Sequence, residues 1–286
     1  MPLFPVRLSS FSLRLRSVLF FVVVCPLALV SVSLRAQGRA QCGDCSAPQS
    51  ETSGTFGRDD PAGPRVHPSI TVGAPSAFGP RWGQVYAGVA YQNRIRYDDW
   101  RDGILTAGAG LGHPERYVGL DLAVHILDTY DQFARDRSLS LKLHRRLPGR
   151  AALAVGCENV WHTAGTDGGS SRYAVGSKLI VLRQHAPFLG AAVVSAGVGN
   201  DRFLPEARFA RGAAGVNGFG SLAVQVARGA NAVATWTGQD LNLGLSVAPS
   251  WAGPVVVTPV LSDVVGTAGD GARFGVMVGV QYTRTR

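Results

Sequence analysis

Alternation of apolar and polar residues with a period of two constrains this chain more than any other feature. In RYVGLDLAVHI, residues 116–126, a Val, Leu or Ile occupies every second position, while Asp121 and His125 fall on the opposite face. The stretches SLSLKLH (138–144), DLNLGLSV (240–247) and RFGVMVGVQY (273–282) repeat this pattern. A period of two indicates β-strands. A soluble sheet turns its apolar face into a core, whereas a closed barrel in a membrane turns that face toward lipid and keeps a polar interior.

From residue 82 onward the chain is predicted to consist of strands, because Gly, Pro and Asn clusters interrupt the alternation and no convincing helix pattern occurs. Most of these segments are near the ten residues that a tilted strand needs to cross a membrane. The predicted strands are 83–92, 103–112, 116–127, 138–147, 151–161, 172–182, 188–199, 218–228, 231–237, 240–248, 254–263 and 272–282.

The connections between these strands alternate in length. Short turns such as HPE, PG and RGAN follow every second strand, and long segments such as NRIRYDDWRD and NDRFLPEARFARGAAG follow most of the others. The tight TGQ connection after 231–237 is the one exception. Short turns on one side and long loops on the other are typical of barrels in the outer membrane. We therefore predict an all-β, antiparallel up-and-down transmembrane β-barrel of about twelve strands.

Residues 1–40 have the layout of a signal peptide. Arg7, Arg14 and Arg16 precede the apolar run 17–33, and small residues at Gly38 and Ala40 favour cleavage before Gln41, with cleavage after Ala36 as a second choice. A retained membrane anchor is the alternative. Removing the five arginines of this segment lowers the formal charge from +9 to +4, so the basic composition does not indicate a nucleic-acid partner.

Residues 41–81 are rich in Pro, Gly, Ser and Asp and show no hydrophobic periodicity. We interpret them as a flexible periplasmic linker or as a tail that enters the lumen. Cys42 and Cys45 form a C-x-x-C for which a small-loop disulfide is the expected state in an exported protein. Metal binding there would need two further ligands nearby, and we predict neither a metal site nor a cofactor.

Taken together, the signal segment, the alternating strands and the alternating connections resemble the bacterial outer-membrane β-barrel class over residues 82–286. The resemblance implies location in the cell outer membrane, contact with its lipid, insertion by the outer-membrane assembly machinery and a monomeric state. Members of this class commonly end in an aromatic residue, whereas this chain ends in TRTR, with Tyr282 four residues earlier. A soluble exported β-sandwich is the alternative fold, but it would need protected edge strands.

Two sets of side chains are assigned roles by their parity, that is, by the face of the strand on which they lie. Charged and polar residues opposite the apolar face are candidates for the lumen lining: Asp121, His125, Lys142, His144, Glu158, Lys178, Asp240 and Arg273. They could pair across a narrow barrel or line a polar passage. Aromatic residues near the strand ends are candidates for the interfacial girdles: Tyr91, Trp161, Tyr173, Phe188, Trp236, Trp251, Phe274 and Tyr282.

The leading functional hypothesis is a narrow, porin-like passive pore for small polar solutes. The alternative is a structural, assembly or ligand-binding barrel without channel activity. A hydrolase in the barrel wall, built from Ser138 or Ser140 with His125 or His144, is disfavoured because these residues have lumen parity and the chain lacks a G-x-S-x-G motif. We therefore expect no enzymatic activity.

Overall fold

The computed structural model describes residues 67–127, 129, 133–164, 169–183, 186 and 188–284. They belong to one compact unit, Cys42–Arg286. The predicted signal peptide, the Cys42–Cys45 disulfide and the first part of the predicted linker lie outside the described residues. In the described ranges, no helix is long and apolar enough to cross a membrane.

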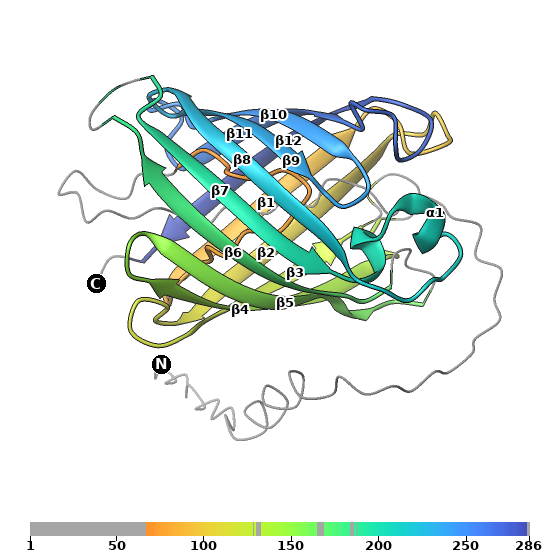
Figure 1. Cartoon of the computed structure of the whole chain (residues 1–286), viewed down its shortest axis with the longest axis horizontal. Coiled ribbons are helices and arrows are strands. Elements are labelled where there is room, and N and C mark those ends of the chain that lie inside the picture. Colours follow the sequence, from red (N-terminus) through yellow and green to blue (C-terminus); the bar gives the residue numbers. More distant parts are fainter. Residues whose placement is uncertain are drawn as a thin grey trace, which may run out of the picture. The chain divides into compact units, whose positions relative to one another are not determined.

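Twelve antiparallel strands close into a barrel (Figure 1). Each strand pairs with its neighbours in sequence, and β1 closes the ring against β12 in a continuous register from Gln84↔Thr283 to Gln92↔Gly275. The strands are β1 (Gln84–Gln92), β2 (Asp102–Gly112), β3 (Gly119–Ile126), β4 (Arg137–Leu147), β5 (Ala151–His162), β6 (Ser171–Val181), β7 (Ala191–Gly199), β8 (Asn217–Ala227), β9 (Ala230–Trp236), β10 (Leu241–Val247), β11 (Val255–Ser262) and β12 (Arg273–Thr283).

The predicted all-β barrel fold is confirmed, and each predicted strand boundary lies within three residues of the observed one. The turns after β2, β4, β6, β8 and β10 define the short-turn end of the barrel, where the described chain also ends; the opposite rim is the loop end. The longest connection at the loop end follows β7 and contains a 3-10 turn η1 (Asp201–Phe203) and a short helix α1 (Glu206–Phe209).

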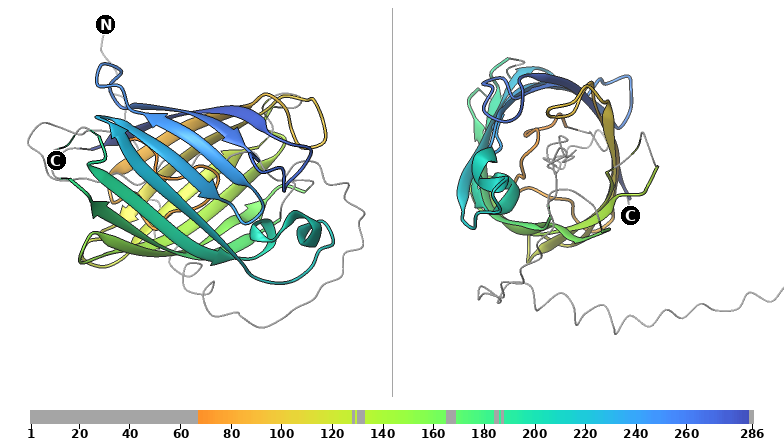
Figure 2. Two further views of the ribbon diagram at one scale, coloured as in Figure 1. Left: turned by 45° about the horizontal axis from the view of Figure 1, so that its top comes forward. Right: turned by 90° about the vertical axis from the view of Figure 1, so that its right-hand side faces the viewer.

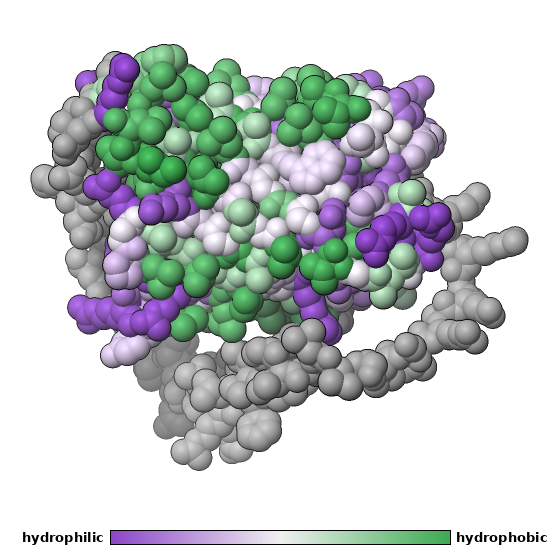
Figure 3. All heavy atoms as spheres, viewed as in Figure 1, coloured by the Kyte–Doolittle hydropathy of each residue, from purple (hydrophilic) through white to green (hydrophobic). Residues whose placement is uncertain are grey.

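The apolar face of the strands lies on the outside of the barrel. Val124 on β3 is 52% exposed and Leu153 on β5 is 56% exposed, whereas Asp121 and Lys142 are each 7% exposed on the inner face. Figure 3 shows hydrophobic spheres over much of the wall and hydrophilic ones mostly toward its two ends. Because the ring closes, no strand edge is left without hydrogen-bond partners. A sandwich with a buried apolar core is thereby excluded.

An irregularity in the pairing of β4 with β5 shapes the inner face near the loop end. Leu139 pairs with Trp161 and Leu141 pairs with Cys157, so β5 bulges between these pairs. Asn159 in the bulge has φ of +49°, and its backbone N–H donates to Ser140 Oγ at 3.1 Å. Glu158, next to the bulge, lies in the barrel interior, where it is 3% exposed.

Candidate functional site: the filled lumen

Residues 68–80 are buried inside the barrel and are called the lumen segment below. In the right-hand view of Figure 2 the strands form a ring, and the orange chain of this segment runs within it. The composition of residues 41–81 predicts a linker for this stretch, with entry into the lumen as the other interpretation. For residues 68–80, the structure shows the second arrangement.

The lumen segment enters and leaves at the short-turn end. At its start, Asn231 Nδ2 donates to the carbonyl of Ser69 at 3.2 Å, close to the β8–β9 turn. At its other end, His144 Nε2 lies 3.1 Å from the carbonyl oxygen of Pro80, three residues from the end of β4. Both ends therefore lie at the same rim, and the segment forms a loop inside the barrel.

Between these points the segment reaches almost to the loop end. The backbone N–H of Val72 donates to Thr235 Oγ1 at 3.1 Å, one residue from the end of β9. On the return path, the backbone N–H of Ala77 donates to Ser177 Oγ at 2.9 Å, near the middle of β6. Hydroxyl groups of the wall thus replace the backbone partners that a strand would have supplied, which keeps these buried amides satisfied.

The lumen segment turns back near the loop end, and this turn depends on Gly73. Its φ is +80°, and a Cβ at this position would lie 2.8 Å from Asn242 Nδ2. Its carbonyl oxygen accepts a hydrogen bond of 3.1 Å from Arg202 Nη1, which comes from η1 in the loop after β7. The lumen segment is therefore held at its turn by a side chain from the loop end.

Apolar side chains of the segment form a core with the inner wall. Ile70, Val72 and Phe78 are between 0% and 3% exposed. Burying such side chains contributes about 1.5–3 kcal/mol each, or roughly 5–9 kcal/mol together as an upper estimate. Their cluster includes wall residues that point inward: Ala90, Ile104, Tyr173, Val175, Val193, Phe219, Val233, Val260 and Met277.

A buried ion pair next to the turn joins the wall to the loop end. Arg202 donates from Nε and Nη2 to the two carboxylate oxygens of Glu158, and its guanidinium lies 4.3 Å from the centre of the Phe203 ring. Phe203 is fully buried and stacks on Phe219 at 4.5 Å between ring centroids. The paired charge and the packed rings together fix the position of Arg202 above Gly73.

A second polar cluster lies inside the loop end. Arg96 Nη1 donates to Gln239 Oε1 at 2.8 Å, and Asp240 Oδ2 lies 3.4 Å from Arg96 Nη2 and 3.7 Å from Arg273 Nη2. All four side chains are buried. At the edge of this cluster, Tyr97 donates to Glu206 Oε1 at 2.8 Å, and this hydrogen bond raises the pKa of Tyr97. The loops thereby cover part of the opening above the lumen segment.

The remaining inward charges lie on β3 and β4 and are also partnered. Asp121 Oδ2 lies 3.4 Å from Lys142 Nζ, and Tyr86 donates to Asp121 Oδ1 at 2.8 Å. His125 Nδ1 lies 2.9 Å from Thr106 Oγ1, and His125 Nε2 lies 3.2 Å from Ser140 Oγ. These groups pair with one another, which is what a buried polar network requires.

Seven of the eight predicted lumen residues lie inside the barrel and are buried: Asp121, His125, Lys142, His144, Glu158, Asp240 and Arg273. Lys178 is different, because it is exposed on the outer face of β6. The same strand carries the other wrong assignment: Tyr173, predicted for the outer girdle, is 7% exposed and packs inside against Phe203 and Phe219. The two errors have one cause, a reversed parity for β6.

The reversal has a physical reason. β6 has apolar residues at both parities, so its sequence alone does not show which face looks inward. Tyr173 and Val175 face the lumen because residues of the lumen segment and of η1 give them apolar partners there. A water-filled lumen would have favoured the opposite orientation.

The other girdle candidates lie near the two rims and are wholly or partly exposed. At the loop end are Tyr91, Trp161 (56% exposed), Trp236 and Phe274; at the short-turn end are Phe188, Trp251 and Tyr282 (65% exposed). Such positions suit rings that are half in lipid and half in water.

The sequence left the location of the lumen segment open between a linker and a lumen-entering tail and assigned it no function. Its one signal is the pair of apolar groups Ile70–Val72 and Phe78 inside a stretch otherwise rich in Gly, Pro and Ser. The sequence also gave no role to Arg202, which lies in the long connection NDRFLPEARFARGAAG. Neither has a periodic pattern, because each contacts the wall through single side chains and backbone groups.

The residues considered for wall chemistry do not meet at the outer surface. Ser140 and His125 are in contact but face the lumen segment, and His144 contacts Pro80 instead of a serine. Cys157 is a buried free thiol. Over the described ranges, no group of three His, Cys, Asp or Glu side chains could hold a metal ion.

The chain matches no protein-family model and no curated protein. What the structure shows is therefore the architecture: a closed antiparallel barrel of twelve strands, the general form of outer-membrane barrels, with its lumen filled by its own residues 68–80.

Proposed function

We propose that this protein is an outer-membrane β-barrel that is closed to solutes at rest and that admits small polar solutes only when the lumen segment leaves. The observation that carries this proposal is the burial of every residue from 68 to 80 inside the ring of strands. Lipid on the outer face, delivery by a signal peptide and insertion by the assembly machinery remain parts of the proposal. The exposed apolar wall and the aromatic rims support contact with lipid, and the residue pattern of 1–40 supports delivery by a signal peptide.

The energetics favour a closed resting state. The buried apolar side chains contribute up to roughly 5–9 kcal/mol, and the hydrogen bonds to Thr235, Ser177 and Arg202 add to the hold on the segment. The path of the segment also favours reversible opening. Both of its ends lie at the short-turn end, so it can withdraw as a loop without threading a chain end through the barrel.

Planar-bilayer recordings of three proteins test the proposal. The chain from residue 41 and a variant lacking residues 41–66 should both show almost no conductance, because both retain the lumen segment. A variant lacking residues 41–80 should show discrete current steps. Heat-modifiable migration on gels checks that each protein is a folded barrel.

Steady current steps from the chain with its segment intact would contradict closure at rest. A folded barrel lacking residues 41–80 that still carries no current would contradict the solute passage and favour the second candidate, a non-conducting structural barrel. The apolar packing of Ile70, Val72 and Phe78 against the wall is the specific observation that keeps this second candidate in view.

A further inference from the structure

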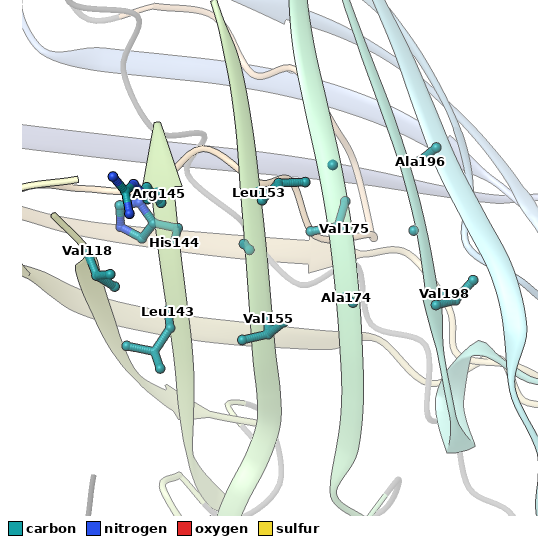
Figure 4. A pocket seen from close by; sticks show the side chains of 13 residues that line it. Val118, Leu143, His144, Arg145, Leu153, Val155, Ala174, Val175, Ala196 and Val198 are labelled. Carbon is teal, nitrogen blue, oxygen red and sulfur yellow. The ribbon is translucent and has the colours of Figure 1, made fainter. Parts of the chain in front are cut away.

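A shallow apolar groove crosses the outer wall of the barrel over β4 to β7. Its outward lining includes Leu143, Leu153, Val155, Gly176, Ala196 and Val198 (Figure 4). The hollow follows from the register: Leu153 pairs with Gly176, and Gly176 pairs with Ala196, so small side chains on β6 and β7 lie beside larger ones on β5. A shallow apolar groove of this kind is complementary in shape and polarity to a flexible hydrocarbon chain.

Two cations flank this groove on the outer wall. Arg145 on β4 lines it, and Lys178 on β6 follows Gly176 on the same face of its strand. Arg145 pairs with Leu153 and Lys178 pairs with Ala151, so the two cations lie on either side of β5 and near the short-turn end. Two interstrand spacings and a stagger of two residues along β5 separate their backbones by about 12 Å, and both side chains are long enough to converge on one anion.

Neither cation has an acidic partner among the residues that the structure describes. Both are exposed, and within the described ranges no hydrogen bond or ion pair joins Arg145 or Lys178 to another side chain, whereas the neighbouring Arg146 lies 3.2 Å from Glu115. A cation on a lipid-facing strand is costly unless it reaches an interface or a counter-ion. A phosphate group meets that need, bidentately at an arginine and as a point charge at a lysine.

We propose that this groove is a binding site for one anionic phospholipid, with the phosphate between Arg145 and Lys178 and an acyl chain along Leu153, Gly176 and Ala196. The inference rests on the proposed membrane location but not on the lumen segment or on conductance. It assigns to the barrel wall a lipid of defined charge, beyond the general contact that every membrane barrel makes.

Native mass spectrometry of the intact chain tests the site. The protein is released from micelles containing either phosphatidylglycerol or phosphatidylcholine with identical acyl chains. We expect one retained phosphatidylglycerol per protein and much less phosphatidylcholine. The double variant Arg145→Gln/Lys178→Gln should lower phosphatidylglycerol retention about tenfold or more, because it removes both charge-assisted contacts.

Two further variants separate the groove from the charges. Gly176→Leu should also lower retention, because its side chain fills the hollow while both cations remain. A Cβ at Gly176 meets only ordinary contacts, the nearest at 3.4 Å from Leu153 Cδ2, so this variant keeps the fold. Arg284→Gln is the matched control; it removes an exposed cation beyond β12, on another part of the wall, and should retain the lipid fully.

Equal retention of the two lipids would overturn the proposal, as would undiminished retention by the Arg145→Gln/Lys178→Gln protein. A dimer peak that replaces the lipid-bound monomer would also overturn it, because it would assign the groove to a second copy of the chain. Preferential retention of lipopolysaccharide over phosphatidylglycerol would overturn it too, because the groove would then bind a different lipid. Insertion into vesicles and conductance are read separately, so failure of the wall site and failure of the proposed function are distinguishable.

Discussion

Arg202 reaches from the loop end to the turn of the lumen segment and donates a hydrogen bond to the carbonyl oxygen of Gly73. Replacing it should therefore loosen the segment without touching the strands. The single variant Arg202→Gln would also leave Glu158 as a buried unpaired charge, which costs about 3–5 kcal/mol. The double variant Glu158→Gln/Arg202→Gln avoids that charge and isolates the contact with Gly73.

The expected magnitude follows from the bond that is lost. A hydrogen bond from a charged donor contributes about 1.5–3 kcal/mol, and each 1.4 kcal/mol changes an equilibrium tenfold. Withdrawal of the lumen segment should then become about ten to a hundred times more frequent in the double variant. The strands should keep their stability, because their ladder is unchanged.

Hydrogen exchange followed by mass spectrometry measures this withdrawal directly. The amides of Val72 and Ala77 donate to wall hydroxyls and exchange only when the segment leaves its place. In the double variant their exchange should accelerate by the factor above while peptides from β2 and β11 keep their rates. Arg208→Gln is the control, since Arg208 bonds within its own loop to the carbonyl of Ala214.

Unchanged exchange at residues 70–78 in the double variant would show that Arg202 does not hold the segment. Equal acceleration of the segment and the strands would show that the barrel and its contents open as one unit. The first result would refute the role of Arg202, and the second would refute the separation between a stable wall and a releasable segment on which the proposed function depends.

Three other predictions follow from named contacts. Phe78→Ala should destabilise the folded barrel by about 3–5 kcal/mol in urea titrations, because it leaves a cavity between segment and wall, whereas the exposed Phe133→Ala should change little. Val89→Arg, near the middle of the outer face of β1, should cost about 2–4 kcal/mol in lipid vesicles, while Val89→Thr costs less; an arginine tolerated there without loss would contradict a lipid-facing wall. The hydrogen bond from Arg94 lowers the pKa of Asp270, so the stabilisation by this loop pair is fully present above the ordinary pKa of an aspartate and is lost as pH falls through the lowered value. Carboxyl NMR titration should show the pKa of Asp270 rising toward its ordinary range in Arg94→Gln, and an unchanged titration would exclude this pair as the cause.

The sequence predicted the barrel because the physics of a strand is local. Side chains alternate along each strand, and a wall between lipid and an enclosed interior needs a different chemistry on each side. On β4, one face therefore carries Leu139, Leu141 and Leu143, and the other carries Ser138, Lys142 and His144. This alternation alone indicates which face meets lipid and which meets the interior. The lengths of the connections follow from the same alternation. For this reason twelve strands and seven of the eight lumen residues could be placed from residues alone.

Only the tertiary structure decided what fills the interior. The lumen segment has no period, and its hydrogen bonds end on single side chains of distant strands, such as Ser177 and Thr235, which no local pattern connects to residues 72 and 77. Its apolar residues in turn made it favourable for Tyr173 to face inward, which set Lys178 on the outside. Parity is a property of one strand, but the choice of which face looks inward depends on what the rest of the chain brings into the barrel.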